Sequence, residues 1–164
     1  MQTKTHDESC KNGFDFLIGN WRIRNRRLVA RLMGCQEWEE FPGTLMERPV
    51  LDGLGSIGEF RAWIGKREII GLLIRIFHPS MNQWSQRWID HARLELEPPV
   101  FGAFANGRGL FEGDDLWEGK KVRARLSWTI VSSDEVTWEQ AFSTDDGATW
   151  ETNWTMQLTR CHAI

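Results

Sequence analysis

The stretch VRARLSWTIV, residues 122–131, decides the fold because its apolar and polar residues alternate one by one. In a β-strand, successive side chains point to opposite faces of the sheet. The alternation therefore predicts a strand with one dry face and one solvated face. The residues expected on the dry face are Val122, Ala124, Leu126, Trp128 and Ile130.

The same alternation continues in the two segments that follow. One segment places Val136, Trp138, Gln140 and Phe142 on a shared face, and the other places Trp150, Trp154, Met156 and Leu158 there. Short turn signals, Ser132-Ser133-Asp134 and Asp146-Gly147, separate the three segments. The C-terminal part of the chain is therefore expected to form an antiparallel meander.

Two earlier segments also read as strands with one aromatic face. Trp21, Ile23 and Asn25 alternate with arginines, and Trp84, Gln86, Trp88 and Asp90 share a second face. Turn signals recur at short intervals, and only residues 12–17 suggest a short helical turn. The chain is predicted to be all-β, with about ten antiparallel strands in a sandwich or closed barrel.

Composition limits the classes of function. The 164 residues fit one domain, residues 1–164, with a flexible segment expected at residues 1–11. A net charge of −3 gives no overall attraction to nucleic acid or acidic membranes, and no apolar run approaches a membrane span. No secretory signal is recognisable, and Cys10, Cys35 and Cys161 show no C-x-x-C spacing. We expect reduced thiols and a cytoplasmic location, although a Cys10–Cys161 bond stays open.

The stretch STDDGATW, residues 143–150, resembles the aspartate box of sialidases and related β-propellers. Those proteins repeat the box in successive blades, whereas this chain has one copy and is too short for a propeller. Ser143 and Asp145 can accept hydrogen bonds from turn amides, and Gly147 permits a positive φ. We therefore interpret the box as a hairpin device and not as a sign of glycan hydrolysis.

Both ends of the strand series carry a further resemblance. Gly19-Asn20-Trp21 is a G-x-W at the start of the first strand, and the last strand ends in Leu158-Thr159-Arg160. The combination resembles the calycin barrels, among them lipocalins, fatty-acid-binding proteins and nitrobindin-like haem barrels. The resemblance implies an up-and-down barrel in which Arg160 covers Trp21 and closes one end. The alternative is that Trp21 and Arg160 are unrelated.

A closer likeness covers nearly the whole chain. The runs FDFLIGNW, EWEEFPGT and WEQAFSTDDGATWETNW, with the closing TR, resemble a bacterial family of domains of unknown function within the calycin group. The resemblance implies a ten-stranded barrel with a central cavity and self-association, such as a homodimer. It implies no reaction.

Patterns that would indicate nucleotide, nucleic-acid or metal binding are either absent from the sequence or have structural explanations. The stretch GLGSIG, residues 53–58, matches a dinucleotide fingerprint, but a strand pattern follows it instead of a helix. The arginines at 22–31 could bind nucleic acid, yet Glu37, Glu39 and Glu40 lie on the next strand and can pair with them. No histidine and cysteine spacing suggests a metal site. Haem stays an open alternative, with His162 as the nearest candidate ligand.

The aromatic residues carry the functional prediction. Ten Trp and nine Phe occur beside no Tyr. If the tryptophans converge inside a barrel, they line a cavity for a small hydrophobic or aromatic molecule. A loop at residues 111–119 could cover it. The predicted ligand-binding residues are Asn25, Arg27, Trp88, Asp90, Trp128, Trp138, Gln140 and Trp154.

Other interpretations of the same residues stay open. The polar groups could satisfy one another and buried water in a packed core. The protein could then be a filled-barrel protein-interaction module. It could instead be a small-molecule enzyme using the carboxylate of Asp90 or Glu112.

Overall fold

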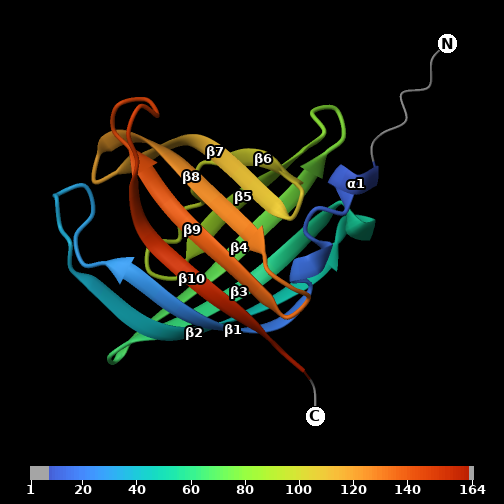
Figure 1. Ribbon diagram of the computed structural model, residues 1–164, viewed down its shortest axis with the longest axis horizontal. Coiled ribbons are helices and arrows are strands. Elements are labelled where there is room, and N and C mark those ends of the chain that lie inside the picture. The colour runs from blue at the N-terminus through green and yellow to red at the C-terminus, as the bar shows by residue number, and fades with distance from the viewer. Residues whose placement is uncertain (1–7, 163–164) are drawn as a thin grey trace.

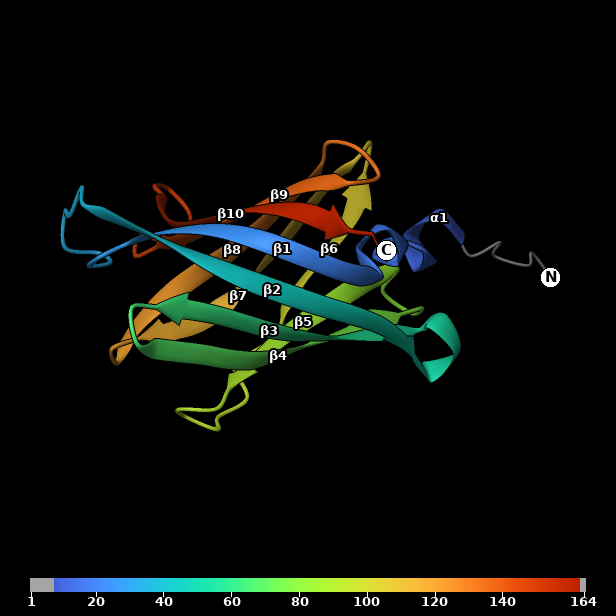
Figure 2. The same ribbon diagram turned by 90° about the horizontal axis from the view of Figure 1, so that it is seen from below.

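The computed structural model describes residues 8–162, which form a closed antiparallel barrel of ten strands. Each strand pairs with its neighbours in sequence, and β1 closes the ring against β10, as Figures 1 and 2 show. The strands are β1 (Gly19–Leu28), β2 (Trp38–Val50), β3 (Gly55–Ile64), β4 (Arg67–His78), β5 (Gln83–Asp90), β6 (Val100–Ala105), β7 (Arg108–Trp117), β8 (Lys120–Ile130), β9 (Glu135–Ser143) and β10 (Glu151–Cys161). The predicted up-and-down calycin-like barrel is confirmed.

Helical structure is confined to short segments. Helix α1 (Glu8–Lys11) and the 3-10 turn η1 (Asp15–Leu17) precede the barrel, and η2 (Leu51–Gly53) joins β2 to β3. Of the segment expected to be flexible, residues 1–7 lie outside the described residues. Cys10, Cys35 and Cys161 are free thiols. Among residues 8–162, no helix has the length and apolarity that a membrane crossing needs.

The predicted alternation holds in β1, β8 and β9, and one predicted loop is wrong. Residues 111–117 belong to β7, where Phe111 is fully buried and faces the interior. Glycines allow this strand to lie close to its neighbour, because a Cβ at Gly113 would meet the Pro99 carbonyl oxygen at 2.5 Å. The glycine and acidic residues of this segment occupy positions in a paired strand.

A β-bulge in β10 changes the alternation of inward-facing and outward-facing residues that the sequence predicted for this strand. The register against β9 shifts between Thr152 and Trp154, so the strict alternation expected from Trp150 to Trp154 is interrupted. Asn153 is fully buried at the bulge. Trp150 precedes the strand, and the Arg125 guanidinium lies 3.8 Å from its ring centroid.

The aspartate-box stretch forms the hairpin that the sequence predicted. Ser143 Oγ accepts a hydrogen bond from the Gly147 amide at 2.8 Å, and Asp145 Oδ1 accepts one from the Thr149 amide at 2.8 Å. Trp150 Nε1 donates to the Gly147 carbonyl at 3.0 Å. Hydrogen bonds from Thr149 lower the pKa of Asp145 to about 2. The box is therefore a turn built from its own side chains.

The chain before β1 seals one end of the barrel. Phe14 and Leu17 are buried there, and Phe14 packs edge-on against Trp84 at 5.2 Å between ring centroids. Trp84 Nε1 donates to the Cys10 carbonyl at 2.7 Å, which ties the segment to β5. In Figure 1 this sealed end lies on the side of α1.

Arg160 stacks on Trp21 at the same end. The Arg160 guanidinium lies 4.2 Å from the Trp21 ring centroid. It donates to the Phe16 and Ile18 carbonyls at 2.6 Å each and to the Ser133 carbonyl at 2.9 Å. One side chain thus joins the first strand, the N-terminal segment and the β8–β9 turn.

Gly19 of the G-x-W has a definite role in this closure. Its φ of +124° is unfavourable for residues with a side chain, and a Cβ there would lie 2.8 Å from Arg160 Nη1. Trp21 Nε1 donates to the Leu17 carbonyl at 2.8 Å, so the indole is satisfied while 1% exposed. The motif therefore makes room for the arginine that covers its tryptophan.

We predict that Arg160→Ala lowers the free energy of unfolding by about 3 kcal/mol, because three carbonyls and the indole lose their cover. Urea denaturation followed by near-ultraviolet circular dichroism measures the loss. Arg22→Ala is the matched control, since Arg22 is an exposed arginine of β1. A change in Arg160→Ala no larger than that in Arg22→Ala would contradict the closing role.

Candidate functional site

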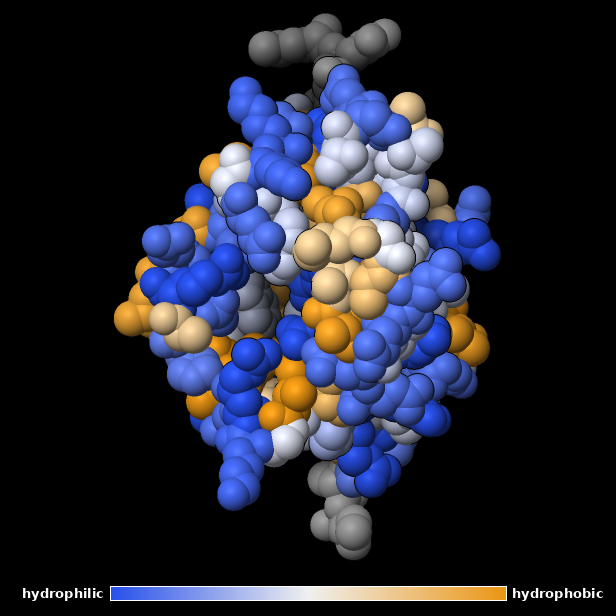
Figure 3. Space-filling view, turned by 90° about the vertical axis from the view of Figure 1, so that its left-hand side faces the viewer, coloured by the Kyte–Doolittle hydropathy of each residue, from blue (hydrophilic) through white to orange (hydrophobic). Residues whose placement is uncertain are grey.

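The opposite end of the barrel is formed by the long connections. The β1–β2, β5–β6 and β9–β10 loops, residues 29–37, 91–99 and 144–150, all lie there. These loops lie toward the left in Figure 1, away from α1. Figure 3 looks onto this end, where hydrophilic groups surround a hollowed surface with apolar groups between them.

Burial of the inward-facing side chains differs between the two ends. At the sealed end most of them are almost inaccessible to solvent, with Trp21 at 1%, Trp84 at 2% and Phe111 at 0% exposure, while Phe104 is half-buried. At the other end six inward-facing aromatic and aliphatic side chains are half-buried, although neighbours such as Phe41 at 5% and Phe142 at 5% exposure are buried. We call this half-buried set the barrel mouth; its members are Ile64, Ile69, Leu73, Trp88, Trp117 and Trp154.

A layer of aromatic rings crosses the barrel beneath the mouth. Phe60 contacts Trp88 at 5.6 Å and Trp154 at 6.2 Å between centroids, although β3 and β10 are not neighbours. Trp154 also meets Trp138 edge-on at 6.1 Å. Gly71 lets the Trp88 ring lie against β4, because a Cβ there would overlap the ring at 2.0 Å. These rings form a rigid apolar floor.

The four predicted tryptophans thus divide into two groups. Trp128 and Trp138 face inward and are buried at 4% and 7% exposure. Trp88 and Trp154 also face inward but remain half-buried at the mouth. All four indoles point to the interior, and only the second group offers surface to a molecule entering from solvent.

Asn25 and Gln140, two of the predicted polar residues, support the wall. Asn25 Oδ1 accepts a hydrogen bond from Trp154 Nε1 at 3.1 Å, and Gln140 Nε2 donates to Asn153 Oδ1 at 2.9 Å. Asn25 is fully buried, and its amide nitrogen has no protein partner. Both contacts fix side chains of β10 near the bulge, so these residues set the orientation of Trp154.

Arg27 and Asp90, the other two, lie at the mouth with charged partners. Arg27 Nη2 pairs with Glu39 Oε1 at 2.7 Å and faces the Trp154 ring at 5.2 Å. Asp90 accepts hydrogen bonds from the Ala92 amide at 3.0 Å and the Arg93 amide at 2.9 Å. These hydrogen bonds and the Arg93 charge lower the pKa of Asp90, against the opposing effect of burial, which is the largest single influence on it. Asp90 is therefore an anion that shapes the β5–β6 loop.

Sequence reasoning missed a buried polar cluster below the aromatic layer. Arg75 and Glu47, both 0% exposed, form an ion pair inside the barrel, and Ser56 Oγ donates to Glu47 at 2.6 Å. Arg75 Nε donates to Gln86 at 3.2 Å and its guanidinium lies 5.5 Å from the Trp128 ring. Gly58 gives the Glu47 carboxylate its space, since a Cβ there would overlap Oε2.

This cluster keeps hydrogen-bonding capacity that the protein does not use. Arg75 Nη2, Gln86 Nε2 and Trp128 Nε1 are buried donors without a protein partner. Glu47 Oε2 is an acceptor without one. Strand alternation did place Gln86 inward, but an inward Arg75 inside the apolar run of β4 gave no signal before its partners were known. Unused buried donors of this kind mark the polar part of the interior.

Burial shifts the pKa values of two carboxyl groups at the mouth. Burial raises the pKa of Glu97 above its ordinary value, with the Asp115 charge adding to the effect and Arg93 opposing it. Burial likewise raises the pKa of Asp115. Both groups line the side of the mouth formed by β7 and the β5–β6 loop.

Several other candidates lie outside the interior. Glu112, suggested as a pocket carboxylate, is wrong in that role, because it lies on the outer face and pairs with Arg125 at 2.8 Å. His162, the suggested haem ligand, is 69% exposed beside Asp134, and none of the three described histidines faces the interior. The residues therefore do not fit haem ligation by histidine. Residues 8–162 contain no cluster of metal-ligating side chains.

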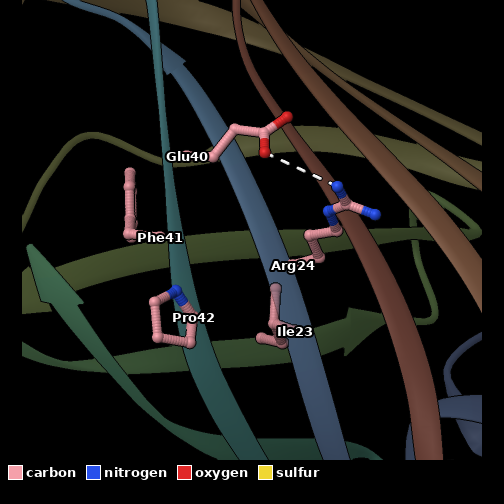
Figure 4. Close-up of a pocket in the computed structure, with 5 residues that line it drawn as sticks. All are labelled: Ile23, Arg24, Glu40, Phe41 and Pro42. Atoms are coloured by element: carbon pink, nitrogen blue, oxygen red, sulfur yellow. Dashed lines mark ion pairs between the residues drawn. The ribbon is translucent and has the colours of Figure 1, made fainter.

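A shallow groove of about 300 Å³ runs along the outside of β1 and β2. Figure 4 shows its lining, with Arg24 Nη2 and Glu40 Oε2 paired at 3.5 Å above Pro42. The exposed charges here neutralise each other across the ladder, as the sequence suggested for the arginine-rich strand. The groove is open surface and lies apart from the mouth.

Comparison with known proteins supports the fold. The S-type phycobiliprotein lyase CPES from Guillardia theta has a similar structure, with a TM-score of 0.63 over 92% of each chain and 10% sequence identity. At this identity the likeness shows a shared calycin-like barrel. No family model and no curated protein matches the sequence. The resemblance to a bacterial family of domains of unknown function therefore stays a prediction.

We predict that Glu47→Gln destabilises the protein by about 3 kcal/mol, because Arg75 is then left as a buried charge without its anion. Chemical denaturation measures this. The double variant Glu47→Leu with Arg75→Met removes both charges and should lose less stability than Glu47→Gln. Equal stability of Glu47→Gln and the parent would show that the pair carries no such constraint.

Proposed function

We propose that the protein binds a small, largely apolar or aromatic molecule at the barrel mouth without transforming it. The observation that carries the proposal is the half-buried state of inward-facing Trp88, Trp117 and Trp154 at one end of a barrel that is sealed at the other. Indole faces held in place by packing bind flat apolar surfaces at low entropic cost. The ligand lies on the aromatic floor and contacts these three rings.

The polar residues then have separate roles. Arg27 and Asp90 lie at the mouth and limit how the ligand enters, while Asn25 and Gln140 hold Trp154 and the bulge in place. Trp128 and Trp138 support the floor from below. The similar barrel from Guillardia theta is named as a phycobiliprotein lyase, which supports including biliverdin, a linear tetrapyrrole, among the test ligands.

A second candidate, a small-molecule enzyme, is favoured by one observation. Glu97 and Asp115 combine a raised pKa with a position at the mouth, and groups of that kind act as general acids in clefts. Asp90 lacks this property because hydrogen bonds hold it ionised. Turnover of a bound molecule that is lost in Asp115→Asn would establish this second function in place of the first.

We expect Trp88→Leu to weaken binding of the tightest-binding test ligand at least fivefold. This corresponds to about 1 kcal/mol of binding free energy, because the contact with the indole is lost. Calorimetry with pyrenebutyrate, palmitate, haemin and biliverdin identifies that ligand and measures its affinity. Trp63→Leu is the control, because Trp63 lies on the outer face of β3 and is 38% exposed. Absence of binding by all four compounds, or equal weakening in both variants, would refute the proposal.

The outer face of β3–β5 supports the expected homodimer. β4 also carries apolar residues on its outer face. Ile70, Leu72 and Ile74 point away from the barrel there, beside Ile57 and Ile89 on the neighbouring strands. Contiguous apolar surface of this kind favours self-association. We propose that two copies of the chain meet on this face.

Leu72→Glu is predicted to convert a dimer into a monomer, because a carboxylate would be buried between the two copies. Sedimentation velocity at micromolar concentration measures the state. The control Leu110→Glu changes an exposed leucine of β7 at 51% exposure and should remain dimeric. A monomeric parent protein would rule the dimer out.

A further inference from the structure

Arg31 crosses the barrel mouth. It belongs to the β1–β2 loop, yet its guanidinium lies 4.6 Å from the Trp117 ring centroid and 5.5 Å from that of Trp154. Phe142 lies at 6.0 Å. These rings come from β7, β10 and β9 and all face inward, so the charged group is held among the aromatic residues of the mouth.

This guanidinium has no anionic partner among the described residues. No carboxylate oxygen lies within 4.0 Å of it, whereas Arg27, Arg93 and Arg160 all have one at that range. Its N–H groups donate no hydrogen bond to residues 8–162 either. A guanidinium stacked on rings keeps its edge free, and that edge is the part that binds oxyanions.

The two carboxylates whose charges act on Arg31, Glu97 and Glu151, are already engaged. Glu151 accepts a hydrogen bond from the Leu32 amide at 2.8 Å, and Glu97 pairs with Arg93. Burial lowers the pKa of Arg31 to about 10, the Arg27 charge adds to this, and the attraction of Glu97 and Glu151 does not offset it. Asp115 also faces the mouth, where burial raises its pKa. Arg31 is thus left without a directly paired anion among the described residues.

The loop fixes Arg31 in this position. The contact of the Leu32 amide with Glu151 ties the loop to the start of β10, and Leu32 itself packs against the core. The Val29 amide donates to the Glu37 carbonyl at 3.0 Å and closes the base of the loop. A cation held without an anion in a partly desolvated aromatic site is preorganised for an anionic ligand.

We propose that the ligand of this barrel is an organic acid, whose carboxylate binds the free edge of Arg31 while its aromatic or apolar body lies on Trp117 and Trp154. The proposal rests on the proposed function and specifies the class of ligand. It assigns Arg31 as the residue that distinguishes acids from neutral analogues of the same shape. Glu151 is a positioning residue, since it acts through the loop.

The test compares two probes that differ in one group, pyrenebutyric acid and pyrenebutyramide. Energy transfer from tryptophan to pyrene reports their binding to the full chain. The acid should bind about tenfold more tightly than the amide, the value of one charge-assisted hydrogen bond. In Arg31→Gln the ratio of the affinity for the acid to the affinity for the amide should fall to about one.

Arg26→Gln is the matched control, because Arg26 also stacks on a tryptophan, Trp38 at 4.5 Å, but on the outer face. It should keep the tenfold preference, and Arg31→Lys should keep part of it. Equal binding of both probes to the parent, or tighter binding of pyrenebutylamine, would overturn the acid assignment and leave the proposed function standing. Failure of all three probes to bind, together with no binding of palmitate, haemin or biliverdin, would instead refute the binding function itself.

Discussion

The stack of Arg160 on Trp21 is the contact on which the rest of the structure depends. It joins the last strand to the first and holds the N-terminal segment across one barrel end through the Phe16 and Ile18 carbonyls. With that end closed, Phe14 and Leu17 fill the interior beside it. The filled half forms a stable base, and the aromatic floor is built on it.

This asymmetry explains how one barrel can be both packed and open. The N-terminal segment covers one end of the ten-stranded barrel, and half-buried inward-facing side chains lie at the end that it does not reach. Aromatic side chains suit that boundary because they are rigid and tolerate partial exposure. The charged groups follow the same division: Arg75 and Glu47 neutralise each other in the filled half, while Arg31 has no ion pair with the described residues at the mouth.

The fold could be predicted from sequence because two of its signals are visible in the chain itself. Strand alternation is a local pattern, and the G-x-W motif and Arg160 lie near the two ends of the strand series. The inward direction of Trp128, Trp138 and Asn25 followed from the same phase. The bulge near Asn153 could not be predicted, since one inserted residue leaves no periodic signal. Arg31 and the Arg75–Glu47 pair were also missed, because their meaning depends on partners far away in sequence.

The central claim, a barrel sealed at one end and accessible at the other, is tested most directly by solvent access to individual tryptophans. Fluorine NMR of protein labelled with 5-fluorotryptophan, with a soluble paramagnetic agent added, measures that access residue by residue. Faster relaxation at Trp88, Trp117 and Trp154 than at Trp21, Trp84 and Trp128 is the predicted result. Uniformly slow relaxation at all six, or fast relaxation at Trp21 and Trp84, would contradict the account.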